Sequence, residues 1–161
     1  MKSIVLHPDP RLRQRAAEIS DVANPEIQTL IPEMIESMKA HNGVGLAAPQ
    51  IGELVRLIIV SHKSGPIAMI NPKIVHKSFK RLWEEEGCLS IPGVYGDVKR
   101  HLGVTATYTD AQGQPQKLEA EGLLARIIQH EVDHLNGVLF IDKAKNIHEL
   151  DPKDYEQVGE N

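Results

Sequence analysis

The stretch that decides the fold is EGLLARIIQHEVDHLNG, residues 121–137. Its apolar residues, among them Leu124 and Ile128, recur at helical spacing, and Gly137 is a residue type that often ends a helix. The pattern predicts a helix from about residue 122 to residue 136, with one apolar stripe that packs on the rest of the protein.

The same stretch contains the motif HEVDH, with histidines at positions 130 and 134. Residues four apart lie above one another on a helix, so both imidazoles can bind one metal ion from the same side. Glu131 is rotated by part of a turn and can reach a water on that metal without being a ligand. The alternative is a pair of surface histidines. We favour the metal site because Leu123 and Ile127 precede His130 on the same face of a well-predicted helix.

A catalytic site of this kind needs a third protein ligand and an open position for water. The long zinc-protease pattern would place a histidine at position 140, where this chain has Phe140. Glu149 and Glu156 lie in a polar segment with a weak helical pattern, which disfavours a rigid ligand. The remaining candidate is Cys88 in GCLSIP, residues 87–92, because a thiolate binds Zn²⁺ or Fe²⁺ strongly.

Cys88 is the only cysteine, and it directly follows three glutamates. These carboxylates are a poor setting for a free nucleophilic thiolate, whereas a bound cation stabilises a thiolate despite them. An inert buried cysteine is the other alternative. The spacing of the residues alone does not decide whether Cys88 is a metal ligand or an inert cysteine.

A second helix is predicted over NPEIQTLIPEMIESMKAHNG, residues 24–43. Asn24 can cap it, Pro25 suits its first position, and Gly43 can end it in a left-handed conformation. Pro32 removes one backbone hydrogen bond and is expected to kink the helix or to delay its regular part.

The middle of the chain has the composition of β-strands, and a turn signal at 110–113 predicts a hairpin. Strands grouped before one late helix indicate an α+β fold, with antiparallel or mixed sheets packed around the HEVDH helix. The predicted strands cover residues 55–61, 67–75, 79–83, 102–109 and 115–120.

Composition limits the class of protein. The 161 residues, 41% hydrophobic and 25% charged, fit one soluble domain. The single cysteine and an N-terminus unlike a signal peptide predict a cytoplasmic location, and no apolar stretch reaches the ~20 residues of a membrane span. The net charge of −4 argues against nonspecific nucleic-acid binding, and we interpret Arg11, Arg13 and Arg15 as solvated surface.

Three motifs together resemble the signature motifs of the peptide deformylases. They are GVGLAAPQ at 43–50, EGCLS at 86–90 and QHEVDH at 129–134, in the family's order. The resemblance extends from about Val5 to Ile141. It implies a single catalytic domain, which we place at residues 1–145, followed by a short acidic tail at 146–161.

The resemblance implies that Cys88, His130 and His134 bind one divalent metal ion. It favours Fe²⁺ as the physiological ion, although the ligand set also accepts Zn²⁺, Ni²⁺ or Co²⁺. A metal-bound water would attack the formyl group of an N-terminal formyl-methionine and release formate. Glu131 would act as general base and then acid.

In this resemblance, the Leu89 backbone N–H and the Gln50 side-chain amide hold the substrate oxygen. Val44 and Gly45 pair with the substrate backbone. Glu86 and Arg100 match a pair that supports the cysteine loop. Taken alone, Gly43, Gly45 and Gln50 would be read as turn and surface residues, and Glu86 with Arg100 as a surface ion pair. Helical spacing adds Leu123 and Ile127 as walls of a methionine pocket.

The expected partners are nascent formyl-methionyl polypeptides, without a membrane or sequence-specific nucleic acid. Some members of the family dock on the ribosome through a basic C-terminal helix. Residues 149–161 contain five acidic residues and one lysine, so we expect no ribosome contact of that kind. Two alternatives are a zinc endopeptidase that uses Glu149 or Glu156 as a ligand, and a silent metal-binding scaffold, which Glu131 disfavours.

Overall fold

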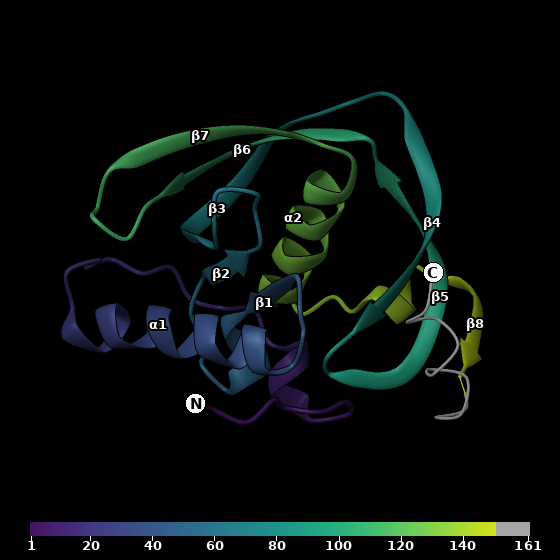
Figure 1. The fold of residues 1–161 in the computed structure, drawn as a ribbon, viewed down its shortest axis with the longest axis horizontal. Coiled ribbons are helices and arrows are strands. Elements are labelled where there is room, and N and C mark those ends of the chain that lie inside the picture. Colours follow the sequence, from purple (N-terminus) through teal and green to yellow (C-terminus); the bar gives the residue numbers. More distant parts are fainter. Residues whose placement is uncertain (151–161) are drawn as a thin grey trace.

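The computed structural model describes residues 1–150, which form two α-helices and two antiparallel sheets (Figure 1). The expected α+β fold is therefore confirmed. Neither helix within residues 1–150 is long and apolar enough to cross a membrane. The helices are α1 (Pro25–Ala40) and α2 (Gly122–Leu135), and the strands are β1 (Gly45–Ala47), β2 (Leu57–Val60), β3 (Ile67–Lys77), β4 (Arg81–Cys88), β5 (Ile91–His101), β6 (Gly103–Thr109), β7 (Pro115–Glu121) and β8 (Lys145–Glu149).

Helix α2 lies between the two sheets (Figure 1). The larger sheet has the strand order β1-β2-β3-β6-β7, and the smaller has the order β4-β5-β8. Ala125, Ile128 and Leu135 of α2 are fully buried and pack against apolar side chains of the larger sheet, such as Ile58 and Met69. Each large side chain buried in this way contributes about 1.5–3 kcal/mol to folding.

The ends of α2 fix the direction in which its side chains point. The helix starts directly after β7, with Gly122 at φ +63°. At the other end Gly137 has φ +73°, the Gly137 N–H donates to the His134 carbonyl, and the Val138 N–H donates to the Asp133 carbonyl. This is the Schellman arrangement, and it confirms Gly137 as the helix stop.

Helix α1 begins as predicted, because the Asn24 side chain accepts a hydrogen bond from the Glu26 N–H. The helix is regular from Pro25 and runs through Pro32, so a delayed start is wrong. The prediction for Gly43 is also wrong. Asn42 takes the left-handed conformation at φ 54°, which asparagine tolerates better than most residues, while the Gly43 N–H donates to the Met38 carbonyl.

Most predicted strands are confirmed, and three strands are missing from the predicted list. The segment predicted at 79–83 overlaps only the start of β4, and the list does not include β1, β5 or β8. Because β8 pairs with β5 at Val94↔Glu149, the sheet continues past the domain boundary placed at residue 145. The rest of the acidic tail, with Glu156, lies outside the described residues.

Candidate metal centre and active site

Three ligand atoms meet where β4 ends against α2. Cys88, His130 and His134 each offer one atom, and these atoms all lie within 4.8 Å of one another. The Cys88 Sγ is 3.3 Å from the His134 Nε2. Tetrahedral Zn²⁺ or a similar ion places its sulfur and nitrogen ligands ~3.4–3.6 Å apart, given bond lengths of ~2.3 and ~2.1 Å. The residues therefore fit one cation.

Two buried polar atoms beside this group have no hydrogen-bond partner within residues 1–150. They are Glu131 Oε2 and His134 Nδ1. A buried polar group that lacks a hydrogen-bond partner lowers the stability of the fold by about 1–3 kcal/mol. Such atoms therefore indicate a site that binds a ligand or an ion. Burial holds the pKa of His134 well below its ordinary value, which favours the neutral imidazole that binds metals.

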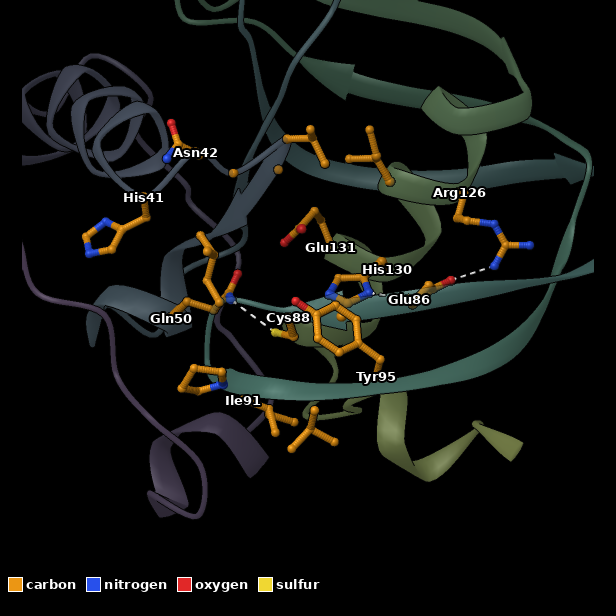
Figure 2. Close-up of a pocket in the computed structure, with 18 of the residues that line it drawn as sticks. His41, Asn42, Gln50, Glu86, Cys88, Ile91, Tyr95, Arg126, His130 and Glu131 are labelled. Carbon is orange, nitrogen blue, oxygen red and sulfur yellow. Dashed lines mark hydrogen bonds and ion pairs between the residues drawn. The ribbon is translucent and has the colours of Figure 1, made fainter. Parts of the chain in front are cut away.

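Glu131 is a buried carboxyl with a raised pKa. Burial raises the pKa of this carboxyl to about 7, against the opposing charge of His130. Figure 2 shows its carboxylate between β1 and α2, pointing into the space in front of His130. A base with a pKa near neutrality is suited to taking up and returning a proton at physiological pH.

Glu86 orients the first histidine. The His130 Nδ1 lies 2.9 Å from Glu86 Oε1, which leaves Nε2 for the cation (Figure 2). Arg100 donates two hydrogen bonds of 2.9 Å to the same carboxylate, and Arg126 donates one of 2.6 Å. Burial alone would raise the pKa of Glu86, but Arg100 and His130 overcome it and hold that pKa well below its usual range.

His130 is linked to the same network. Burial lowers its pKa, but hydrogen bonds to Cys88 and Glu86 outweigh this effect and raise the pKa to about 10. A cation that binds here therefore displaces a proton from this group of residues.

Sequence reasoning missed two charged residues of this network, Arg126 and Asp133. Arg126 is buried, donates to the carbonyls of Leu82 and Val98, and contacts Glu84 at 3.1 Å. Asp133 binds Arg100 at 2.6 Å. The available signal was spacing, because Arg126 precedes His130 by four residues and so lies on the ligand face of α2.

Gly45 allows β1 to approach the catalytic helix. A Cβ at this position would lie 2.7 Å from Glu131 Oε1 and 2.8 Å from Ile127 Cγ2. Strand β1 is also the outer strand of the larger sheet, with β2 as its only neighbour there. One edge of β1 is therefore available to pair with another extended chain.

Gln50 and Leu89 are neighbours of Cys88, the first through its side chain and the second as the next residue in the chain. The Gln50 Nε2 is 3.5 Å from Cys88 Sγ and 3.2 Å from Ser90 Oγ, while its Oε1 accepts from the Ala47 N–H (Figure 2). The carboxamide is thus buried and fixed in orientation. Leu89 lies in the turn between β4 and β5.

A pocket of about 580 Å³ opens in front of these residues. Ile127 forms a buried part of its wall, whereas Leu123 is 64% exposed. The structure brings all the predicted site residues except His134 and Arg100 to this pocket. Those two lie behind it, each at most 3% exposed. Sequence reasoning missed the following lining residues: His41, Asn42, Glu85, Ile91, Pro92, Gly93, Val94, Tyr95 and Arg126.

Glu149, the ligand of the endopeptidase alternative, lies elsewhere. It is an exposed residue of β8 and does not belong to the group formed by Cys88, His130 and His134. The fold and the site therefore define a hydrolase of the HExxH class whose third metal-ligand candidate is a cysteine.

Comparison with known proteins gives the family. The polypeptide deformylase family model matches residues 1–149. A peptide deformylase of Thermoanaerobacter pseudethanolicus is 47% identical over 94% of this chain and 93% of its own length. The crystal structure of peptide deformylase from Thermotoga maritima matches with a TM-score of 0.87 and 39% identity, over 90% of this chain and 98% of the other.

A third match is a class I type b peptide deformylase from Acinetobacter baumannii, solved with Met-Ala-Ser bound. Its TM-score is 0.84 at 34% identity, covering 89% of this chain and 98% of the other. The chain belongs to the peptide deformylase family, the metal-dependent enzymes that remove N-formyl groups from nascent peptides.

Proposed function

We propose that this chain hydrolyses the formyl group from the N-terminal formyl-methionine of newly made polypeptides and releases formate. The observation that carries the proposal is the convergence of Cys88, His130 and His134 beside Glu131 at a pocket bordered by an open strand edge. The Acinetobacter relative with bound Met-Ala-Ser supports it, because this tripeptide is what remains of formyl-Met-Ala-Ser after deformylation.

Cys88, His130 and His134 would hold one divalent cation. We propose Fe²⁺ as the physiological ion, while the sulfur and nitrogen ligands also suit Zn²⁺, Ni²⁺ or Co²⁺. When bound, such an ion would lower the pKa of a water molecule toward neutrality and so supply the nucleophile.

Glu131 would move the proton of the reaction. Its carboxylate takes the proton from the attacking water and returns it to the departing amine. Gln50 and the Leu89 N–H donate to the oxygen of the formyl group as negative charge develops there. A single donor of this kind contributes about 3 kcal/mol to transition-state stabilisation.

Substrate binding would use two surfaces of the pocket. Val44 and Gly45 pair with the substrate backbone along the free edge of β1. Leu123 and Ile127 contact the methionine side chain. Glu86 and Arg100 would have no contact with substrate and would act by orienting His130 and the cysteine loop.

The proposed setting follows from the substrate. Nascent formyl-methionyl chains are the partners, and the cytoplasm is the compartment where they are made. Residues 1–145 would form the catalytic domain, and the rest of β8 would extend its smaller sheet. Any ribosome contact would use a surface other than the acidic tail.

The test is formate release from formyl-Met-Ala-Ser by anaerobically purified, iron-loaded protein, with Glu131→Gln as the comparison. We expect robust release by the wild type and a loss of at least about 100-fold in kcat for Glu131→Gln, with the metal content unchanged. No formate from the iron-loaded wild type would contradict the proposal and would favour the scaffold. Cleavage of internal peptide bonds, with metal retained in Cys88→Ala, would favour the endopeptidase.

A further inference from the structure

A basic and aromatic surface surrounds the start of β4, at the end of the strand away from Cys88. Phe79 precedes the strand and is fully exposed, at 103%, and Trp83 is 44% exposed. Arg81 lies seven positions before Cys88, which corresponds to ~23 Å of strand. We call this the β4 basic surface, and it consists of Lys77, Phe79, Lys80, Arg81, Trp83, Lys99 and Lys145.

Strand pairing and ring contacts gather four of these side chains, those of Arg81, Trp83, Lys99 and Lys145. Arg81 pairs with His101 and Trp83 with Lys99, and directly opposite residues point to the same face of an antiparallel pair. The ammonium group of Lys99 lies 5.9 Å from the Trp83 ring centroid, and that of Lys145 lies 4.7 Å from it. Trp83 therefore holds two cations over its ring by cation–π attraction. Figure 1 shows β4 at the outer side of the molecule, beyond α2.

None of the five cations of the β4 basic surface has an ion-pair partner within residues 1–150. Strand pairing places two acids on the Trp83 face, Glu85, which pairs with His148 at 3.5 Å, and Asp97, which accepts from Asn146. The side chain of Glu121 lies beside Ser78, close to the start of β4. By contrast, Arg11 and Arg13 near the N-terminus are neutralised by Asp9 and Asp142. On the Trp83 face, Arg81, Lys99 and Lys145 therefore outnumber the acids, although the whole chain carries −4.

We propose that the β4 basic surface binds single-stranded RNA without sequence preference. The phosphates would contact Arg81, Lys99 and Lys145, which lie around Trp83, and one base would stack on the exposed ring of Phe79. Flexible cations around an exposed aromatic ring are the elements that bind single strands, because every base has a face that can stack. This function is separate from deformylation, and it departs from the expectation, drawn from the net charge of −4, that the chain does not bind nucleic acid nonspecifically.

An anionic membrane is the competing ligand, and the geometry favours it less. Membrane insertion needs several apolar side chains that protrude together, with a wide apolar face. Here Phe79 is the one exposed aromatic ring of the surface that has no cation over it. The Trp83 ring lies beneath two ammonium groups, which keeps these cations over the sheet, where a phosphate chain can reach them.

The test uses a fluorescently labelled 12-nucleotide oligouridylate, with anisotropy reporting affinity. Trp83 is the only tryptophan, so its emission shows whether the oligonucleotide reaches this surface. We expect binding to weaken with salt at a log–log slope of about −2, since each of three phosphate contacts contributes about −0.7. Phe79→Ala is expected to weaken binding by at least about 5-fold, through loss of stacking.

Charge reversal provides the sharper comparison. The double variant Arg81→Glu with Lys99→Glu is expected to weaken binding at least about 10-fold and to reduce the salt slope by about 1.4. Lys39→Glu with Lys63→Glu makes the same charge change on α1 and the β2–β3 loop and is expected to retain binding. All variants are expected to release formate from formyl-Met-Ala-Ser at the wild-type rate.

Four results would overturn the proposal. They are no binding at low salt, binding without a change in Trp83 emission, an equal loss in the two double variants, and binding to phosphatidylglycerol vesicles without binding to the oligonucleotide. Dextran sulfate provides a control for simple ion exchange. Binding that is as tight for dextran sulfate as for the oligonucleotide, and that Phe79→Ala does not affect, would also contradict the stacking contact.

Discussion

The two faces of helix α2 meet two different environments. On one face Ala125, Ile128 and Leu135 are fully buried against the larger sheet, with no charged group among them. On the other face Arg126 and Asp133 bind charged partners of the smaller sheet, Glu86 and Arg100. The same helix is thus held by apolar packing on one side and by ion pairs on the other.

Apolar packing and ion pairs have different effects on the helix. Apolar burial is roughly proportional to area and has little directionality, so it stabilises the helix without fixing side-chain orientation. Buried ion pairs add little net stability because desolvation offsets the attraction, but removing one partner is costly. The carboxylate of Glu86 accepts hydrogen bonds from Arg100 and Arg126 and contacts the His130 ring nitrogen, and these contacts fix the orientation of the three side chains. We therefore infer that the apolar face stabilises the fold and the ionic face positions the ligands.

The largest effect is expected from Glu86→Ala, which breaks the ionic face. The change leaves two arginines buried without their carboxylate and His130 without its orienting partner. The free energy of unfolding is expected to fall by about 3–5 kcal/mol, and metal affinity by about 10–100-fold. Denaturant unfolding and competition with a chelator measure the two quantities.

Glu85→Ala is the matched control for that change. Glu85 is the preceding residue of β4, exposed on the opposite face. It is expected to leave metal affinity unchanged. Equal metal affinity in the wild type and Glu86→Ala would contradict a positioning role for the ionic face.

Ile128→Ala breaks the apolar face instead. Ile128 is fully buried, so its truncation is expected to lower the free energy of unfolding by about 2–5 kcal/mol. Metal affinity, measured well below the unfolding transition, is expected to stay within about 2-fold of wild type, because no ligand loses a hydrogen bond. Ile147→Ala, at an exposed site of β8, serves as the control. If Ile128→Ala loses as much metal affinity as Glu86→Ala, the apolar and ionic faces of α2 do not have separate roles.

Much of the apolar face follows from the sequence, whereas the ionic face does not. The spacing of Leu124 and Ile128 predicted α2, and the HEVDH motif predicted two ligands and the base. Strand β5 was missed because Pro92, Gly93 and Gly96 interrupt it and its inner face carries Arg100, so apolar residues do not alternate along it. Strand β8 is exposed at every position and leaves no pattern at all.

The spacing of residues in the sequence also could not predict which charged side chains pair over long distances in the chain. Nothing in the order of residues shows that Arg126 reaches the carboxylate of Glu86, forty positions away. The same holds for Cys88, which became a candidate ligand by elimination and which only the family motifs favoured over an inert cysteine. Spacing alone left it open, because its distance from His134 depends on how β4 packs against α2.

A smaller effect is expected at Gly137, where α2 ends. A Cβ there would lie 2.4 Å from the Arg13 carbonyl oxygen, and φ is +73°. Gly137→Ala is expected to lower the free energy of unfolding by about 2–3 kcal/mol, from the left-handed backbone and the clash together. Gly113→Ala, at φ +84° with open space around it, is expected to cost only about 1 kcal/mol. Equal losses in thermal or denaturant unfolding would show that the backbone contact with Arg13 does not matter.

The smallest effect is expected at the surface pair of Arg13 and Asp142, which is also ionic but exposed. The hydrogen bond from Arg13 lowers the pKa of Asp142, so the stability that this carboxylate adds is present above about pH 4. That contribution is lost as the pH falls through the folded-state pKa. Asp142→Asn is expected to cost up to about 1 kcal/mol at pH 7, and the difference from wild type is expected to shrink below pH 4. A difference that grows on acidification would contradict this sign.

The measurement that tests the central claim most directly is a titration of the metal-free protein with Co²⁺, followed through the sulfur-to-cobalt charge-transfer absorption. One equivalent is expected to produce the full band in the wild type and in Glu149→Ala. Cys88→Ala is expected to show no such band and to bind Co²⁺ at least about 10-fold more weakly. Unchanged affinity in Cys88→Ala, or loss of binding in Glu149→Ala, would show that Cys88, His130 and His134 do not hold the metal together.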